Sequence, residues 1–219
     1  ANDQSAGKAA LSRAGEMALM LTVPSAVALA VIPGPLVSVL FERGAFTAND
    51  TDMTALAVLI YGLGLPSFVL QKVLQPVYFA REDTKTPFKF AIVSMVVNAA
   101  VAVGLMPVIG FFAAAVATTL SGWIMFFMLL IGARRFGDVA RFDARFRTRA
   151  WRITLASFAM GGWLLLTMTV IGPMFGYGGW RWLGLLILVT SGMLSYGIFG
   201  MIFKAFRLSD LKASLRRGA

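Results

Sequence analysis

The stretch Met53–Pro87, MTALAVLIYGLGLPSFVLQKVLQPVYFAREDTKTP, joins a long apolar block to a charged turn. Its apolar part, Met53–Ala80, exceeds the roughly 20 residues that a helix needs to cross about 30 Å of hydrocarbon. The turn that follows, Arg81–Lys85, carries four charges in five residues. The stretch therefore predicts a membrane-spanning helix that leaves the bilayer just after Ala80.

Composition extends this prediction to the whole chain. The 219 residues are 58% hydrophobic and 14% charged, and their mean hydropathy is +0.79. Soluble domains have about a quarter of their residues charged, so this chain has too few polar residues to cover a water-exposed surface. The sequence indicates a polytopic membrane protein.

Six apolar blocks of spanning length divide the chain. They are Ala9–Phe41, Met53–Ala80, Pro87–Val108, Phe111–Ala133, Ala150–Pro173 and Trp180–Phe206. Because backbone groups in lipid must satisfy their own hydrogen bonds, and because the alternation of a barrel is absent, the blocks are expected to be helices. The predicted fold class is an all-α transmembrane bundle of six spans. The predicted kink sites are Pro24, Pro33, Pro35 and Pro66.

The organisation that follows has four parts. Residues 1–133 supply four spans, and residues 134–149 form a basic cytoplasmic loop. Residues 150–206 supply two more spans, and residues 207–219 form a basic cytoplasmic tail. The chain starts without Met and without a signal-peptide pattern, which suggests a piece of a longer protein.

Several function classes are excluded by residue content. The chain has no cysteine and no histidine, so disulfides, thiolate metal sites and imidazole acid–base catalysis are absent from it. Its net charge of +10 does not indicate nucleic-acid binding, because the cations are divided among the apolar blocks instead of forming one face. No paired carboxylates, metal-ligand cluster or phosphate-binding glycine loop indicates a hydrolase or transferase.

Cation placement predicts the orientation. Seventeen of the twenty Lys and Arg residues lie in the N-terminal segment, in every second loop and in the C-terminal segment. The alternate loops hold only Arg43 and Arg181, and Lys72 lies inside a span. By the positive-inside rule, both ends of the chain are cytoplasmic. Within the turn Arg81–Lys85, Glu82 and Asp83 are expected to pair with neighbouring cations.

The segment 138–152 places arginines at helical spacing, at positions 141, 145, 149 and 152. This pattern suits a helix that lies on an anionic leaflet, where each cation near the surface contributes on the order of 1 kcal/mol. The alternative is a solvated loop that only retains positive charge on the cytoplasmic side.

Lys72 is the main candidate binding residue, because cations inside spans are energetically unfavourable. It lies nine residues before Arg81, about 13 Å deeper along a helix that rises 1.5 Å per residue. Gln71 and Gln75 lie beside it and continue a polar flank from Ser67. A cation in a water-filled cavity that receives an anionic substrate is one interpretation. The other is a lysine that reaches the interface.

Two further polar groups interrupt the blocks. Asn98 and Thr118 lie in the third and fourth blocks, where interhelical hydrogen bonding is the simpler interpretation. Glu42 and Arg43 lie where the first block meets the outer surface, either as an interfacial helix-end pair or as gating residues.

Two motifs resemble the MurJ/MviN family, the bacterial lipid II flippases. They are LFERGAFT at Leu40–Thr47 and LQPVYFAREDTKTPFK at Leu74–Lys89. The resemblance implies the last six of fourteen helices, most of the C-terminal lobe of a MATE/MOP-type exporter. It also implies that the N-terminal lobe of the same protein lies outside this sequence.

The implied activity is movement of undecaprenyl-pyrophosphate-linked disaccharide-pentapeptide across the bacterial inner membrane, with membrane lipids as the other partners. Lys72, Gln71 and Gln75 would contact the substrate, and the last two helices resemble a pair that accommodates the lipid tail. No resident cofactor is implied. Alternatives are a related polysaccharide or multidrug exporter, or a non-transporting membrane scaffold.

The resemblance also raises the question of ion coupling. Asn98 and Thr118 match positions of a sodium site in some members of the family. Ala102 stands where a carboxylate would help to hold the ion, and cations prefer several oxygen ligands with formal charge. Coupling to the membrane potential is the other possibility.

Overall fold

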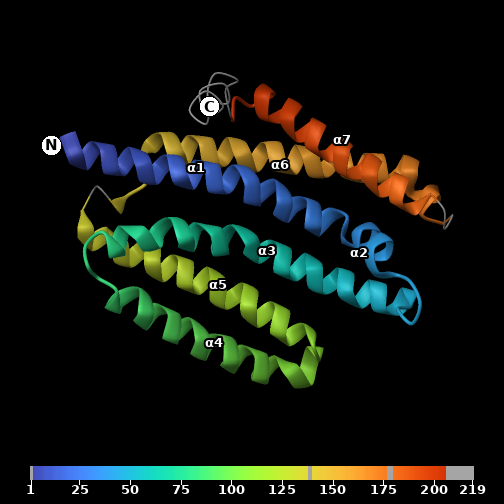
Figure 1. Ribbon diagram of the computed structural model, residues 1–219, viewed down its shortest axis with the longest axis horizontal. Coiled ribbons are helices and arrows are strands. Elements are labelled where there is room, and N and C mark those ends of the chain that lie inside the picture. Colours follow the sequence, from blue (N-terminus) through green and yellow to red (C-terminus); the bar gives the residue numbers. More distant parts are fainter. Residues whose placement is uncertain (1, 138–139, 177–179, 206–219) are drawn as a thin grey trace.

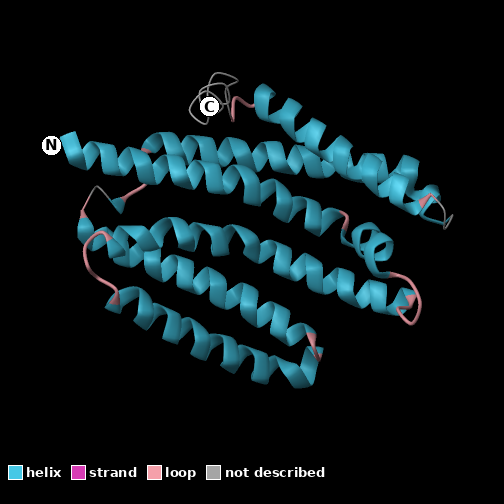
Figure 2. Ribbon diagram, in the orientation of Figure 1, coloured by secondary structure: helices cyan, strands magenta, loops and turns pink. Residues whose placement is uncertain are grey.

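The computed structural model describes residues 2–137, 140–176 and 180–205, and these ranges are helices joined by short loops (Figure 2). The α-helices are α1 (Asn2–Val31), α2 (Pro33–Phe41), α3 (Ala48–Phe79), α4 (Lys85–Ile109), α5 (Phe112–Ala133), α6 (Ala144–Ile171) and α7 (Arg181–Ile202). The short 3-10 helices are η1 (Arg134–Phe136) and η3 (Gly172–Gly176). The predicted all-α fold class is confirmed.

Six of these helical segments are long and apolar enough to span a membrane. They alternate in direction, so that the start of α1, the α3–α4 turn, the α5–α6 connection and the end of α7 gather at one end of the molecule (Figure 1). These are the segments that the cation pattern assigned to one side. Six predicted spans are therefore confirmed, and the basic segments of the described chain share one end.

The first predicted block is two helices instead of one. The backbone of Ile32 leaves the helical region with φ −122° and ψ 39°, and Pro33 begins α2 at its first position. Proline is favoured there because its missing N–H would have no helical partner. Pro24 and Pro66 lie inside α1 and α3 without ending them.

The helices form two groups that meet along α1. Helix α5 packs between α3 and α4, and helix α6 packs between α1 and α7. Helix α1 contacts both α3 and α6, so it lies between the two groups (Figure 1). Each group has its own apolar core, one around Leu74, Tyr78 and Leu129 and the other around Leu164 and Leu188.

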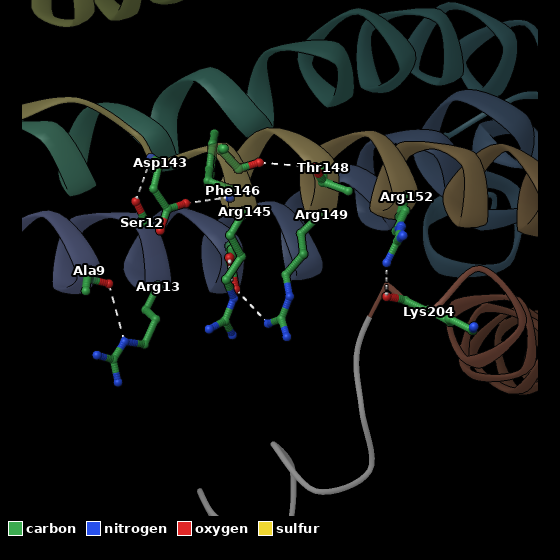
Figure 3. Close-up of polar contacts among 12 residues, drawn as sticks. Ala9, Ser12, Arg13, Asp143, Arg145, Phe146, Thr148, Arg149, Arg152 and Lys204 are labelled. Atoms are coloured by element: carbon green, nitrogen blue, oxygen red, sulfur yellow. Dashed lines mark hydrogen bonds and ion pairs between the residues drawn. The ribbon is translucent and has the colours of Figure 1, made fainter.

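The predicted interfacial helix over residues 138–152 is not a separate helix. Helix α6 begins at Ala144 and continues to Ile171, so its first turns carry the arginines at 145, 149 and 152, Arg141 precedes it, and its later turns cross the membrane. Asp143 fixes this start, since its side chain accepts a hydrogen bond from Phe146 N at 2.6 Å (Figure 3). The predicted basic tail, 207–219, lies outside the described residues.

Candidate functional site

The polar flank of α3 faces α5. Ser67 is fully buried and Gln71 is 8% exposed. Gln71 Nε2 donates to the carbonyl oxygen of Gly122 in α5 at 2.7 Å. A side chain at position 122 would collide with the Phe68 ring and lie 3.0 Å from Ser67 Oγ, so glycine permits the close approach.

Three more side chains bond to the opposite backbone across the same interface. They are Thr119 to Ile60 O at 2.8 Å, Trp123 to Leu63 O at 3.1 Å and Tyr78 to Leu129 O at 2.6 Å. Neutral donors that meet backbone carbonyls avoid leaving polar groups unpaired in an apolar medium. The α3–α5 interface is thus a row of neutral hydrogen bonds, and Gln71 belongs to it.

Lys72 lies on the outer side of α3, one residue and about 100° around the helix from buried Gln71. Its side chain is exposed, and it makes no hydrogen bond or ion pair with the described residues. Gln75 is half-buried on the same part of the helix. The structure therefore leaves an exposed cation inside a predicted span, without an ion pair to the residues that are described. The predicted substrate roles of Lys72, Gln71 and Gln75 stay predictions.

Asn98 and Thr118 are brought together between α4 and α5. Asn98 Nδ2 donates to Thr118 Oγ1 and to Ser121 Oγ, each at 3.2 Å, and Ser94 Oγ donates to Ser121 O at 2.9 Å. The described part of the chain holds no group of three or more His, Cys, Asp or Glu residues suited to a metal ion. The donor set at this point is neutral, so the residues present fit interhelical hydrogen bonding better than a cation.

Glu42 joins three helices at the opposite end from the basic segments. Its Oε1 lies 3.0 Å from Arg181 Nη1 at the start of α7, and its Oε2 accepts from Thr51 Oγ1 in α3 at 3.1 Å. Arg43 does not share in this contact, because its Nη2 donates to Leu40 O at 2.6 Å. Glu42 and Arg43 are neighbours in sequence with separate partners, and their gating role stays a prediction.

The charged turn after α3, Arg81–Lys85, is attached to η1, which directly follows α5. Asp83 pairs with Arg135 in η1, and the Arg81 guanidinium lies 4.7 Å from the centre of the Phe136 ring. Besides the neighbouring cations expected from the sequence, Asp83 thus has a partner that is 52 residues away in the chain. Desolvation alone would raise the pKa of Asp83, but hydrogen bonds from Thr86 and the charges of Arg135 and Lys89 outweigh it and lower the pKa.

The model of the family described as lipid II flippase MurJ matches residues 1–186. The chain belongs to the lipid II flippase MurJ family. This result confirms the family that the two sequence motifs indicated at Leu40–Thr47 and Leu74–Lys89.

MurJ relatives are longer than this chain. Proteins named probable lipid II flippase MurJ from Rhizobium tropici and Rhizobium meliloti (strain 1021) are 34% and 35% identical to it. The alignments cover 94% and 95% of this chain and 39% of each relative. A solved structure of lipid II flippase MurJ in an inward closed conformation superposes with a TM-score of 0.76 at 29% identity, over 92% of this chain and 40% of that one. The chain thus spans about two fifths of the length of the MurJ proteins it matches.

One charged group of this MurJ segment was missed by the sequence analysis. Glu16 in α1 is 7% exposed, and its Oε2 lies 2.7 Å from Arg149 Nη1 in α6. Arg145 Nε lies 3.5 Å from the other oxygen. The sequence does show a carboxylate inside the first predicted span. Its partners cannot be identified from the sequence, because they are more than 125 positions away and only the fold brings them close.

Proposed function

We propose that the full-length protein carrying this chain moves lipid II from the cytoplasmic to the periplasmic leaflet of the bacterial inner membrane. Family membership and six spans support this proposal, and the position of Lys72 is the observation that carries it. Lys72 is exposed inside the span of α3, seven residues before the helix ends at Phe79, in a chain that covers only two fifths of the length of its relatives. Lipid is a poor environment for such a cation, so the rest of the protein and water are expected to surround it.

A diphosphate is an anion that can pair with the ammonium group of Lys72. Crossing hydrocarbon would strip the pyrophosphate of lipid II of its hydration, and a cation in a hydrated cavity would replace part of it. Gln75 is half-buried near Lys72 and can donate a neutral hydrogen bond to the same oxygens. Lys72 would then face the cavity, while Gln71 holds the lysine-bearing segment of α3 against α5.

Alternating access supplies the movement, as in other transporters built from two lobes. In this proposal the ends of the chain are cytoplasmic, because the basic segments share one end of the bundle. The Glu42–Arg181 contact lies at the periplasmic end, where its opening would release α7 from α2. The α6–α7 pair, which packs on α1, would accept the lipid tail.

Ion coupling is not required by this proposal. Asn98 and Thr118 offer neutral groups and no carboxylate, so the proposed transport does not use a sodium ion at this point. The membrane potential acts on any charge that moves with the cavity, at about 2.3 kcal/mol per elementary charge per 100 mV. Lys72 is the charge on which it would act.

Complementation tests the proposal directly. Full-length protein with Lys72→Ala is expected to fail to support growth in cells depleted of their own flippase, while Lys72→Arg retains partial function. Lys89→Ala, which removes an exposed cation near the start of α4, is the matched control and is expected to complement. Immunoblots must show equal amounts of each variant. Normal lipid II export by Lys72→Ala would contradict the cavity assignment.

Labelling gives an independent test. The 219 residues contain no cysteine of their own. A cysteine introduced at position 72 of the full-length protein is expected to react with a membrane-impermeant thiol reagent from at least one side. Protection from both sides would place position 72 against lipid or protein instead of water.

A further inference from the structure

Tyr61 differs from the other tyrosines in the described spans. Tyr78 Oη donates to Leu129 O in α5 at 2.6 Å, and Tyr196 Oη donates to Met20 O in α1 at 2.9 Å. Tyr61 is 42% exposed, and its hydroxyl makes no hydrogen bond with the described residues. A hydroxyl without a partner is unfavourable in hydrocarbon, so this side chain is expected to meet water or a polar ligand.

Tyr61 lies well inside α3. It comes nine residues after Asp52, a charged residue near the start of the helix, and is therefore about 13 Å further along the axis. Lys72 comes nine residues before Arg81, at the same distance from the other charged end. The preference of tyrosine for the membrane–water interface therefore does not account for the position of Tyr61.

The backbone around Tyr61 is held on two sides, because α3 lies between α1 and α5 (Figure 1). Ile60 O accepts from Thr119 Oγ1 in α5 at 2.8 Å. Gly62 packs so closely on α1 that a Cβ there would lie 2.9 Å from Leu29 Cβ. Consecutive helical residues point about 100° apart, so Tyr61 projects from the remaining, open face of α3.

Tyr61 and Lys72 share this open face, which consists of Tyr61, Leu65, Phe68 and Lys72. The two polar residues are eleven positions apart, which is three helical turns and about 16 Å along the axis. Leu65 and Phe68 lie between them and are half-buried. The open face thus offers two separate polar groups, a hydroxyl and an ammonium, to one elongated ligand.

We propose that Tyr61 is a second substrate-contact residue, which binds the disaccharide of lipid II while Lys72 binds the diphosphate. This inference rests on the flippase proposal and assigns a further part of the same substrate. A tyrosine ring packs on the apolar C–H face of a sugar ring, and its hydroxyl exchanges hydrogen bonds with sugar hydroxyls. The disaccharide is joined directly to the diphosphate and extends from it along α3. Tyr61 therefore distinguishes a polyprenyl diphosphate that carries sugars from one that does not.

Paired ligands test this specificity. The full-length protein in detergent is titrated with lipid II and with undecaprenyl pyrophosphate, which has the diphosphate but no disaccharide, and binding is followed by native mass spectrometry. Tyr61→Phe is expected to weaken lipid II binding about threefold to tenfold, the usual effect of one lost hydrogen bond. Tyr61→Ala, which also removes the ring, is expected to weaken it further. Neither variant is expected to change the binding of undecaprenyl pyrophosphate. Unchanged lipid II binding in both variants would overturn the proposal.

Lys72→Ala separates failure of this inference from failure of the flippase proposal. It is expected to weaken the binding of both ligands, because both carry the diphosphate. If it does so while the Tyr61 variants bind lipid II normally, the disaccharide contact is wrong and the flippase proposal stands. If Lys72→Ala weakens neither ligand, the diphosphate assignment of the flippase proposal fails, and a selective loss of lipid II binding in Tyr61→Phe would still support the sugar contact.

Tyr196→Phe is the matched control, since it removes the same hydroxyl from another span. It is expected to lower thermal stability and to bind both ligands as the wild type does. Tyr61→Phe is expected to show the reverse, with unchanged stability and weaker lipid II binding. Equal losses of lipid II binding in the two variants would overturn the proposal. A Tyr61→Phe variant that is less stable but binds lipid II normally would show that Tyr61 bonds to the rest of the protein instead.

A third ligand tells the sugars from the peptide. Undecaprenyl-pyrophosphate-linked disaccharide without the pentapeptide is expected to bind Tyr61→Phe about threefold to tenfold more weakly than it binds the wild type, as lipid II does. If only lipid II is affected, Tyr61 contacts the pentapeptide and the disaccharide assignment is wrong.

Discussion

The α3–α5 interface and the α1–α6–α7 interface both hold helices together in an apolar medium, but their polar contacts differ in chemistry. Between α3 and α5, four neutral side chains bond to backbone carbonyls of the opposite helix. The α6–α7 pair is instead attached at its two ends, by Glu16 with Arg149 and by Glu42 with Arg181. Between these ion pairs lie apolar packing around Leu164 and Leu188 and one neutral hydrogen bond, from Tyr196 Oη in α7 to Met20 O in α1 at 2.9 Å.

The difference follows from depth. Neutral donors can pair in the apolar middle of a bilayer, where an ion pair would lose far more hydration than it regains. Near the surface, water and headgroups reduce that loss, so carboxylate–arginine pairs are tolerated. The polar contacts of α3–α5 therefore lie along its length, whereas the charged contacts of α6–α7 lie at its ends.

The largest effect is expected when Glu16 is left without Arg149. Arg149→Met removes the 2.7 Å partner of a carboxylate that is 7% exposed, and such a change typically destabilises by about 3 kcal/mol. The measurement is equilibrium unfolding of the full-length protein in neutral detergent. Glu16→Gln/Arg149→Met removes both charges and is expected to recover most of the loss. A double variant as unstable as the single one would show that lost packing, not an unpaired charge, is responsible.

A pair of adjacent glycines tests the packing between the ion pairs. A side chain at Gly161 would place Cβ 2.7 Å from Val27 Cγ1 in α1, whereas one at Gly162 would meet nothing within 4 Å. Gly161→Ala is expected to destabilise by about 1–3 kcal/mol, because valine has little freedom to move. Gly162→Ala is expected to stabilise slightly, by at most about 1 kcal/mol, through helix propensity. Equal thermal stabilities of the two variants would show that α1 and α6 are not packed this closely.

Apolar runs and cation placement predicted most of the fold, because both are local properties of the chain. Six spans and their shared basic end could be predicted in this way, and the two motifs predicted the family. The α1–α2 break at Ile32 could be placed only approximately, since several prolines in the first block were candidate kinks. Glu16–Arg149 and Asp83–Arg135 could not be predicted, because each pair joins segments that only the fold brings together.

Gln71 and Lys72 are adjacent in α3, and substituting each in turn tests packing and transport separately. Gln71→Leu removes the hydrogen bond to Gly122 O and is expected to destabilise by about 1 kcal/mol. Lys72→Leu removes an exposed cation and is expected to leave stability nearly unchanged while it abolishes transport. Both are measured by unfolding and by complementation. Loss of transport by a stable Gln71→Leu variant would instead extend the substrate contact to Gln71.

The smallest effect is expected at the charged turn Arg81–Lys85. Hydrogen bonds from Thr86 and the charges of Arg135 and Lys89 outweigh desolvation and lower the pKa of Asp83. Because the folded-state pKa lies below the ordinary value, the stabilisation from this carboxylate is complete above about pH 4 and disappears as the pH falls through the lowered value. Asp83→Asn should therefore reduce the melting temperature slightly at pH 7 and make no difference at the most acidic pH tested. The difference should also shrink in high salt, since the pair is partly exposed and screened. A difference that is constant across pH would mean that the carboxylate acts through its shape and hydrogen bonds, and the attachment of this turn to η1 would then not depend on charge.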